Sequence, residues 1–449
     1  MNVWTILGEF SFLLIIFFFF VFSLYNFIER EKRAFWRSAT FLAGLALLNF
    51  GFRLVKAPLQ NWLFGAAFIL CIFVLILLLA PTSKKRAVEI VGEQEKIDER
   101  DVIFARFDLE EGTDNYKDYY GRKPEYKKVD DEIRKIPDIL SSSHIEKNPE
   151  LFSLAKVEFD FLEHQLSQVQ GEVFEKKMQS SPAENTRLIK NIIKYLGGDI
   201  CGVCLLDQSY VYSHVGRGPE PYGQNIIMSH KYAIAFALEM DLGMIASAPR
   251  APVIVETGRK YVEAAKISIT VASFVRRLGF PARAHIAGSN YQVMLPPLAW
   301  KGGLGELGRL GMLITEKYGP RIRLGLITTD LPLVPDVPVS LGIQEFCRKC
   351  QKCARNCPAQ AIPYGDKSEE NGVLKWTINR EECYRFWRKA GTDCAVCISV
   401  CPFSKPDNSF HNLIRRVTER SSFAQTFSIW ADDFFYGRSP RPKKSPFGI

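Results

Sequence analysis

Four cysteines lie within eleven residues of the segment FCRKCQKCARNCP, which covers residues 346–358. Cys347, Cys350, Cys353 and Cys357 have the spacing C-x2-C-x2-C-x3-C-P. The first three thiolates at this spacing can each bind a different iron of one iron–sulfur cube. The fourth follows a longer step and, in proteins that hold two cubes, ligates the other one. The pattern therefore predicts a second set of cysteines farther along the chain.

That second set is present, because Cys383 is followed by three more cysteines that end at Pro402. The predicted ligands are Cys347, Cys350, Cys353 and Cys401 for one [4Fe–4S] cluster, and Cys357, Cys383, Cys394 and Cys397 for the other. A pair of zinc sites is the alternative, since C-x2-C pairs also suit tetrahedral zinc. Three cysteines at successive x2 steps that end in C-P favour iron–sulfur clusters.

The first part of the chain contains two long uncharged apolar runs, Phe10–Ile28 and Ala57–Ser83. Each is long enough as a helix to cross a hydrocarbon core of about 30 Å. Between them lies a shorter uncharged run, Ser38–Phe52, which can span if the flanking arginines reach the interface. A signal peptide is the alternative, but no positive n-region or small-residue cleavage site is present. Residues 1–86 are therefore predicted to form a membrane anchor of three transmembrane helices.

Positively charged residues predict how this anchor is oriented. They follow the first and third apolar runs, as Arg30, Lys32, Arg33 and Arg37 and then Lys84, Lys85 and Arg86. Such clusters mark the cytoplasmic side, so we expect a multi-pass protein of the cell (inner) membrane with a cytoplasmic body. The net charge of +9 then suits anionic lipid headgroups. No nucleic-acid partner is predicted, because the chain has no helix-turn-helix, zinc-finger or RNA-binding signature.

The remaining chain interleaves helix and strand patterns. Residues 151–169 and 258–281 have helical periodicity, whereas residues 230–241 and 321–333 are typical of strands. The expected fold class is therefore α/β (α+β). The predicted segments are a charged linker and wrapping segment at 87–136, a core at 137–340, the cysteine domain at 341–405 and a tail at 406–449 that packs on the core.

A glycine-rich run, GGLGELGRLGM, covers residues 302–312. Gly303, Gly305 and Gly308 match the bare G-x-G-x-x-G spacing of dinucleotide-binding loops. The preceding residues PPLAWK do not form a clear strand, which disfavours that interpretation. The alternative is a loop that brings the backbone close to a flat ligand, because glycine has no side chain to prevent it.

The run from Gly288 to Leu333, the two cysteine sets and the ending ADDFFYGRSP together resemble the corrinoid-dependent reductive dehalogenases. The resemblance spans about Arg100 to Gly437. It implies a cobalamin-binding core of nitroreductase-like type at 137–340, followed by a ferredoxin-type domain with two [4Fe–4S] clusters. The chain departs from the respiratory members, because no twin-arginine signal precedes the core and a predicted anchor is fused in front.

The resemblance also implies roles for individual residues. Tyr261 matches a proton donor, Arg323 a cation that stabilises the phenolate, and Asn290 a supporting amide. The corrinoid-contacting residues would be Gly303, Leu304, Gly305, Leu307 and Gly308. None of the six histidines has an aspartate two residues before it, as a D-x-H-x-x-G ligand motif requires. A bound cobalamin is therefore expected to be base-off.

The expected function is that of a membrane-anchored, cobalamin-dependent reductive dehalogenase, which converts R–X to R–H and halide. Its expected partners are the lipid bilayer, a small organohalide and an electron donor that is quinol-linked, a ferredoxin or a flavodoxin. Two alternatives are a corrinoid reductase like epoxyqueuosine reductase and a non-catalytic iron–sulfur electron-transfer module of the membrane. Cys201 and Cys204 form a further C-x2-C, for which packing in an apolar strand is favoured over a redox pair.

Overall fold

The computed structural model describes residues 2–82, 88–288 and 291–447 and divides into two compact units. The first unit consists of Met1–Lys85 and Pro406–Ser439, and the second of Arg86–Lys405 and Pro440–Ile449. The chain therefore leaves the first unit, forms the second, returns to the first near its C-terminal end and finishes in the second.

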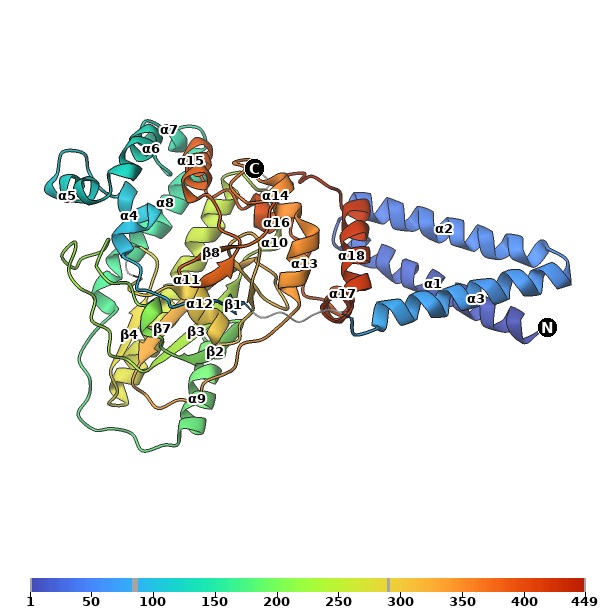
Figure 1. The fold of residues 1–449 in the computed structure, drawn as a ribbon, viewed down its shortest axis with the longest axis horizontal. Helices are drawn as coiled ribbons and strands as arrows, with labels where there is room; N and C mark the ends of the chain where they lie inside the picture. The colour runs from blue at the N-terminus through green and yellow to red at the C-terminus, as the bar shows by residue number, and fades with distance from the viewer. Residues whose placement is uncertain (1, 83–87, 289–290, 448–449) are drawn as a thin grey trace. The chain divides into compact units, whose positions relative to one another are not determined.

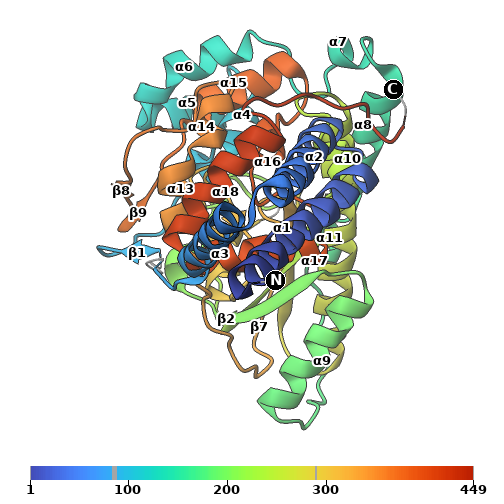
Figure 2. The ribbon, with the colours of Figure 1, turned by 90° about the vertical axis from the view of Figure 1, so that its right-hand side faces the viewer.

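Three helices form the body of the first unit, and each runs antiparallel to the next: α1 (Val3–Ile28), α2 (Lys32–Leu54) and α3 (Ala57–Leu79). Helix α1 packs against both of the others, as the end-on view in Figure 2 shows. Gly8 permits the close approach of α1 to α3, because a Cβ atom there would lie 2.4 Å from the carbonyl oxygen of Phe64. Small residues allow such close backbone contact between membrane helices.

Two of these helices are long and apolar enough to cross a membrane by length and composition. The mean hydropathy of the best 18-residue window is 2.4 in α1 and 3.0 in α3. The middle segment predicted to span is also a helix, α2, but it is less apolar than α1 and α3, and charged residues occur near both of its ends. The basic residues at 84–86 lie outside the described residues.

The tail differs from the sequence-based expectation that residues 406–449 pack on the core. Its two helices, α17 (Ser409–Arg420) and α18 (Ser422–Phe435), instead belong to the first unit, and only Pro440–Ile449 joins the second. The physical reason is aromatic packing, since Phe410 and Phe435 are buried against Phe22 of α1 with ring centres 5.2 and 4.9 Å apart. This contact provides an apolar partner for the tail.

The second unit is built on a four-stranded sheet with the order β2-β3-β7-β4, in which every neighbouring pair is antiparallel. The strands are β2 (Ile200–Leu205), β3 (Tyr232–Glu239), β7 (Ile322–Thr329) and β4 (Ala282–His285). The two central strands, β3 and β7, coincide with the segments predicted as strands. Both are almost fully buried, which explains their nearly continuous apolar sequences.

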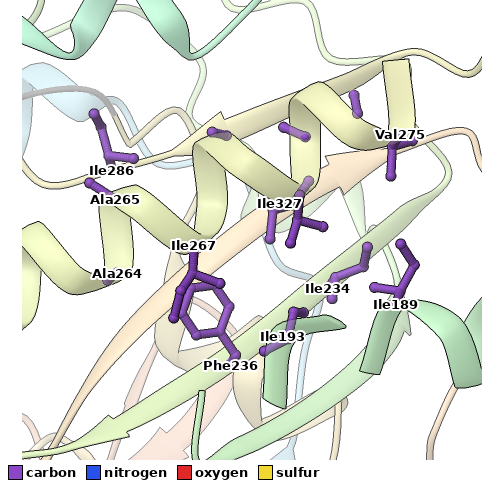
Figure 3. Packing of buried hydrophobic residues seen from close by; sticks show 14 of the residues in the cluster. Ile189, Ile193, Ile234, Phe236, Ala264, Ala265, Ile267, Val275, Ile286 and Ile327 are labelled. Carbon is purple, nitrogen blue, oxygen red and sulfur yellow. The ribbon is translucent and has the colours of Figure 1, made fainter. Parts of the chain in front are cut away.

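Helices cover both faces of this sheet. On one face lie α11 (Pro252–Arg277), α8 (Pro149–His164) and α9 (Pro182–Tyr195), and their apolar residues form one core with the strands. Figure 3 shows α11 crossing the strands, with Ile267 and Val275 above Phe236, Ile234 and Ile327. On the other face, α12 (Leu295–Lys301) packs in a second apolar cluster. Both segments predicted as helices, 151–169 and 258–281, are thus confirmed in α8 and α11.

The charged segment 87–136 is more regular than a linker. It contains strand β1 (Glu89–Ile90) and three helices, α4 (Ile103–Phe107), α5 (Asp114–Arg122) and α6 (Pro124–Arg134). Buried tyrosines at 116, 119 and 120 and a buried Arg106–Asp130 ion pair of 2.6 Å join these helices. The segment folds because its polar residues pair with one another and its aromatic rings share one cluster.

Candidate active site and metal centres

Tyr261 and Arg323 come from different elements of the second unit and meet between them. Tyr261 lies on α11, and Arg323 lies near the start of β7. The guanidinium carbon of Arg323 is 5.4 Å from the centre of the Tyr261 ring. Phe159 of α8 packs edge-on against the same ring, with ring centres 6.3 Å apart. The phenol and the cation that the sequence pairs are therefore neighbours in the fold.

Arg323 is held in place by two further residues. Its Nη2 atom donates to Oδ2 of Asp393 at 2.6 Å and lies 2.7 Å from Oγ1 of Thr257. The Thr257 hydroxyl in turn donates to the same Asp393 oxygen at 2.6 Å. Thr257 lies one helical turn before Tyr261 on α11. The same helix therefore positions the phenol of Tyr261 and the hydroxyl that holds Arg323.

These groups are buried, and their charges influence one another. Burial favours the neutral form of Arg323, but the negative charges of Tyr261 and Asp393 outweigh it and raise the pKa of Arg323. Burial also raises the pKa of the Asp393 carboxyl, against the opposing effect of Arg323. A buried charge without a partner is strongly unfavourable, so each member of this pair needs the other. The arrangement places a permanent cation beside a phenol.

Four cysteines line one cavity in the cysteine domain. They are Cys347 and Cys350 of α13 (Ile343–Cys350), Cys353 of α14 (Lys352–Asn356) and Cys401. These are the four residues predicted to ligate the first cluster. Burial raises the pKa of Cys347 well above the usual range of a thiol, so its thiolate requires a strong neighbouring positive charge such as bound iron. The cavity and its donor set fit an iron–sulfur cube.

The thiols of the second predicted set lie close enough to influence one another electrostatically. Cys397 lies half-buried on α16 (Val396–Ser399), and its pKa is raised first by the low-polarity surroundings of its thiol and then by the charges of Cys394 and Cys383. Cys357 contributes to the same electrostatic group. In the described ranges, no three or more His, Cys, Asp or Glu side chains are arranged to hold a metal ion directly. A cube takes each thiolate on a different iron, which spreads the sulfur atoms over a larger volume than one ion does.

A buried arginine from the glycine-rich run lies beside the first cavity. The Arg309 guanidinium donates to the carbonyl oxygens of Cys347 at 3.0 Å and of Pro363 at 2.7 Å. It also stacks on Trp376, at 4.5 Å from the ring centre. Since a cluster with four thiolates is anionic, a fixed cation at this position stabilises it.

The glycines of the run are packed against the chain itself. A Cβ atom on Gly303 would lie 2.7 Å from the carbonyl oxygen of Val337, and one on Gly305 would lie 2.4 Å from that of Ile314. A Cβ on Gly308 would meet the Ile314 side chain at 2.4 Å. Close backbone packing therefore already requires these glycines. Cofactor contact by Gly303, Leu304, Gly305, Leu307 and Gly308 stays a prediction.

Two other sequence predictions have different outcomes. Asn290 lies outside the described residues, so its role stays a prediction. Cys201 and Cys204 lie on β2, where Cys201 packs against the core under α11 and Cys204 belongs to the cluster on the other face. Burial raises the pKa of both thiols to about 12. The predicted packing role of this pair is confirmed, because the two side chains serve opposite faces of the sheet.

Thr257, Asp393 and Arg309 were not identified from the sequence. Asp393 directly precedes a predicted cluster ligand, Cys394. This position was the only feature of the sequence that could have indicated a functional role for Asp393. The partners of Asp393 are distant in sequence, and a lone threonine on a helix carries no pattern. Tertiary contact alone identifies Thr257 and Asp393 as supports of Arg323.

Comparisons with known proteins identify the cysteine domain and relatives of the chain. Residues 346–405 match the family model of the 4Fe-4S dicluster domain. The tetrachloroethene reductive dehalogenase of Desulfitobacterium hafniense is 31% identical over 300 residues, which cover 56% of this chain and 54% of that protein. The chain thus spans about half the length of the curated relatives that it matches.

Solved structures share the fold. A catabolic reductive dehalogenase in complex with 3-bromo-4-hydroxybenzoic acid superposes with a TM-score of 0.64 at 23% identity, covering 81% of this chain and 50% of that one. A reductive dehalogenase described with a mechanism for B12-dependent dehalogenation gives a TM-score of 0.64 at 22% identity, over 80% and 50% of the two chains. The chain therefore resembles reductive dehalogenases in sequence and in fold, and the resemblance predicted from its motifs is confirmed.

Proposed function

We propose that this chain is a membrane-anchored, cobalamin-dependent reductive dehalogenase, with the reaction R–X + 2e⁻ + H⁺ → R–H + X⁻. The observation that carries the proposal is the Tyr261–Arg323 pair. The pair lies in a fold shared with reductive dehalogenases. Arg323 is hydrogen-bonded to Asp393, which directly precedes the predicted cluster ligand Cys394. The two cysteine sets would hold [4Fe–4S] clusters that deliver single electrons toward this site.

The chemistry is divided between a cofactor and the chain. Cobalamin, when bound base-off in a core of nitroreductase-like type, supplies the low-potential cobalt at which the carbon–halogen bond is reduced. Tyr261 holds the proton at its phenolic oxygen and transfers it to the carbon that loses the halide. Arg323 stabilises the phenolate that remains, and Thr257 and Asp393 keep Arg323 oriented toward the ring. The predicted Asn290 and the loop at 303–308 would complete the binding site.

The first unit supports a membrane location and an orientation for the proposed enzyme. The apolar helices α1 and α3 support anchoring in the cell membrane. The basic residues at 30–37 favour a cytoplasmic second unit, as the positive-inside rule predicts. A small organohalide would be the substrate, and a quinol-linked donor, a ferredoxin or a flavodoxin would supply electrons. A reporter that is active only in the cytoplasm, fused to the C-terminus, tests this orientation.

The experiment that tests the activity is the substitution Tyr261→Phe. It keeps the ring and its packing against Phe159 and removes only the hydroxyl group. Turnover of an organohalide by the reconstituted full chain should fall by about 10²–10⁴-fold, the usual contribution of a positioned proton donor. Iron content and corrinoid content should be unchanged.

Tyr232→Phe is the matched control. Tyr232 packs against the same hydrophobic core but pairs with Thr329, at the opposite end of β7 from Arg323. This variant should keep full turnover. Full turnover by Tyr261→Phe with an intact corrinoid would contradict the assigned proton donor. A reconstituted chain that binds iron but no corrinoid would instead favour the electron-transfer module.

A further inference from the structure

Helix α18 closes one end of the three-helix bundle in the first unit. At its start, the Ser421 hydroxyl donates to the carbonyl oxygen of Leu77 in α3 at 2.7 Å, and the amide of Ser422 donates to the Thr82 hydroxyl at 3.1 Å. At its end, Phe434 packs edge-on against Phe41 of α2, with ring centres 5.7 Å apart. Helix α18 therefore runs from the end of α3 to the beginning of α2, and Figure 1 shows it lying across the helices of the bundle.

The side chains of α18 form three faces. One face is buried in the bundle and contains Ala424, Gln425, Asp432 and Phe435. A second face is a stripe of aromatic rings at Phe423, Phe427, Trp430 and Phe434, with successive ring centres 6.5, 5.7 and 5.4 Å apart. The third face carries Ser422, Thr426 and Asp433, of which Thr426 is exposed and the other two are half-buried. A helix with an exposed apolar face next to a polar face is typical of a membrane surface.

The aromatic stripe is exposed although its rings are large. The exposed fractions are 39% for Phe423, 48% for Phe427 and 51% for Trp430. At its inner end the stripe continues onto α2, where Arg37 lies over the Phe434 ring at 4.6 Å and also donates to the Phe434 carbonyl oxygen. Phe41 of α2, which is exposed, packs against the same ring, so the stripe adjoins the apolar surface of the bundle.

The position of the stripe along the bundle is that of a membrane interface. Trp36, which is exposed in the first turns of α2, lies at the same end as α18, and exposed Trp4 and Trp62 lie at the start of α1 and of α3, at the opposite end. Tryptophan is enriched at both membrane–water interfaces. The 26 residues of α1 span about 39 Å, close to the roughly 40 Å of a bilayer with its headgroups.

We propose that α18 lies in the plane of the membrane surface and inserts Phe423, Phe427 and Trp430 at the boundary between lipid headgroups and acyl chains. The inference rests on the proposed membrane anchoring by α1 and α3. Helix α17 packs against α18, and its exposed cations Arg416 and Arg420 suit anionic headgroups. The C-terminal tail is then a second, in-plane attachment to the bilayer, added to the spanning helices.

Photo-crosslinking to lipid tests this placement. The photoreactive residue p-benzoylphenylalanine replaces Phe427 in the full, cluster-containing chain, reconstituted into vesicles of phosphatidylethanolamine and phosphatidylglycerol. Position 17 on α1 is the control for spanning, since Phe17 is exposed in the middle of an apolar helix. Thr426 on the polar face of α18 and Tyr195, exposed on α9, are the matched low-yield positions.

The expected result is strong lipid labelling at positions 17 and 427 and severalfold less at positions 426 and 195. Labelling at 17 without labelling at 427 overturns the in-plane helix and leaves the anchor in place. No labelling at either position overturns the membrane anchoring itself. A crosslink from 427 to a second copy of the chain, in place of lipid, also overturns the inference, because the stripe would then be a protein interface. Unchanged iron content verifies that each labelled chain is folded.

Discussion

The buried ion pair between Arg323 and Asp393 leads to a quantitative prediction. The exposed fraction of the side chain is 14% for Arg323 and 5% for Asp393, so both charges depend on each other rather than on water. Removal of one partner from a buried pair costs about 3–5 kcal/mol of unfolding free energy. In Asp393→Asn the amide oxygen can still accept hydrogen bonds from Arg323 and Thr257, so we expect a loss near the lower limit, about 3 kcal/mol.

The loss is measured as a shift of the thermal unfolding midpoint of the purified full chain. One kcal/mol corresponds to about 2–4 °C in domains of a few hundred residues, so Asp393→Asn should lower the midpoint by about 6–12 °C. Turnover should also fall, because a neutral amide holds Arg323 against the Tyr261 ring more weakly than the carboxylate does. The double variant Arg323→Leu with Asp393→Leu should lose less than the sum of the two single leucine variants, since no lone charge remains.

An exposed ion pair on α8 gives the matched control. Lys156 and Asp160 pair one turn apart on the helix surface, and each side chain is about half exposed. Asp160→Asn should shift the midpoint very little, because surface pairs contribute roughly 0–1 kcal/mol. If Asp393→Asn behaves like Asp160→Asn, or if the double leucine variant shows simple additivity, the pair is not coupled as its geometry indicates and the positioning argument is wrong.

Three other predictions concern separate parts of the chain. Burial, followed by the charge of Glu256, raises the pKa of Glu158 to about 7 from 4.5. The folded state therefore loses stability as pH rises from about 4.5 to about 7, and Glu158→Gln should raise the unfolding midpoint at pH 8 but change it little at pH 4.5. Cys353→Ser should lower the iron content from about eight atoms per chain and leave the electron paramagnetic resonance signal of one cluster in place. Gly8→Leu should separate α1 from α3 and lower the yield of folded protein in detergent, because its side chain would overlap the backbone of Phe64.

Local patterns predicted the parts of the molecule whose partners are close in sequence. The cysteine spacing identified Cys347, Cys350 and Cys353, which line one cavity because short helices present them within a few residues. Helical periodicity identified α11, whose apolar face covers the sheet. These predictions succeeded because the determining contacts lie within one or two turns of chain.

The support of Arg323 was not predicted, because it depends on chain segments that only tertiary structure brings together. Thr257, Arg323 and Asp393 come from a helix, a strand and the loop before Cys394. None of the three belongs to a periodic pattern that includes the others. The antiparallel order β2-β3-β7-β4 was missed for the same reason, since interleaved helices and strands do not specify strand direction.

The tail shows why the ends of a chain are hard to assign from composition. Residues 406–439 mix polar and aromatic side chains, and this mixture suits a surface segment of a soluble core as well as an interfacial helix. What distinguishes the two is the partner of the tail, because polar side chains of the tail form hydrogen bonds with the end of α1. His411 and Asn408 contact the Glu29 carboxylate at 3.1 and 2.8 Å, and Phe435 packs on Phe22. Glu29 lies at the end of a long apolar helix and needs such partners, since a buried carboxylate is stable only when it is hydrogen-bonded or paired with a cation. The first unit is therefore assembled from two separate parts of the chain, and residues 2–82 alone would leave Glu29 without these two contacts.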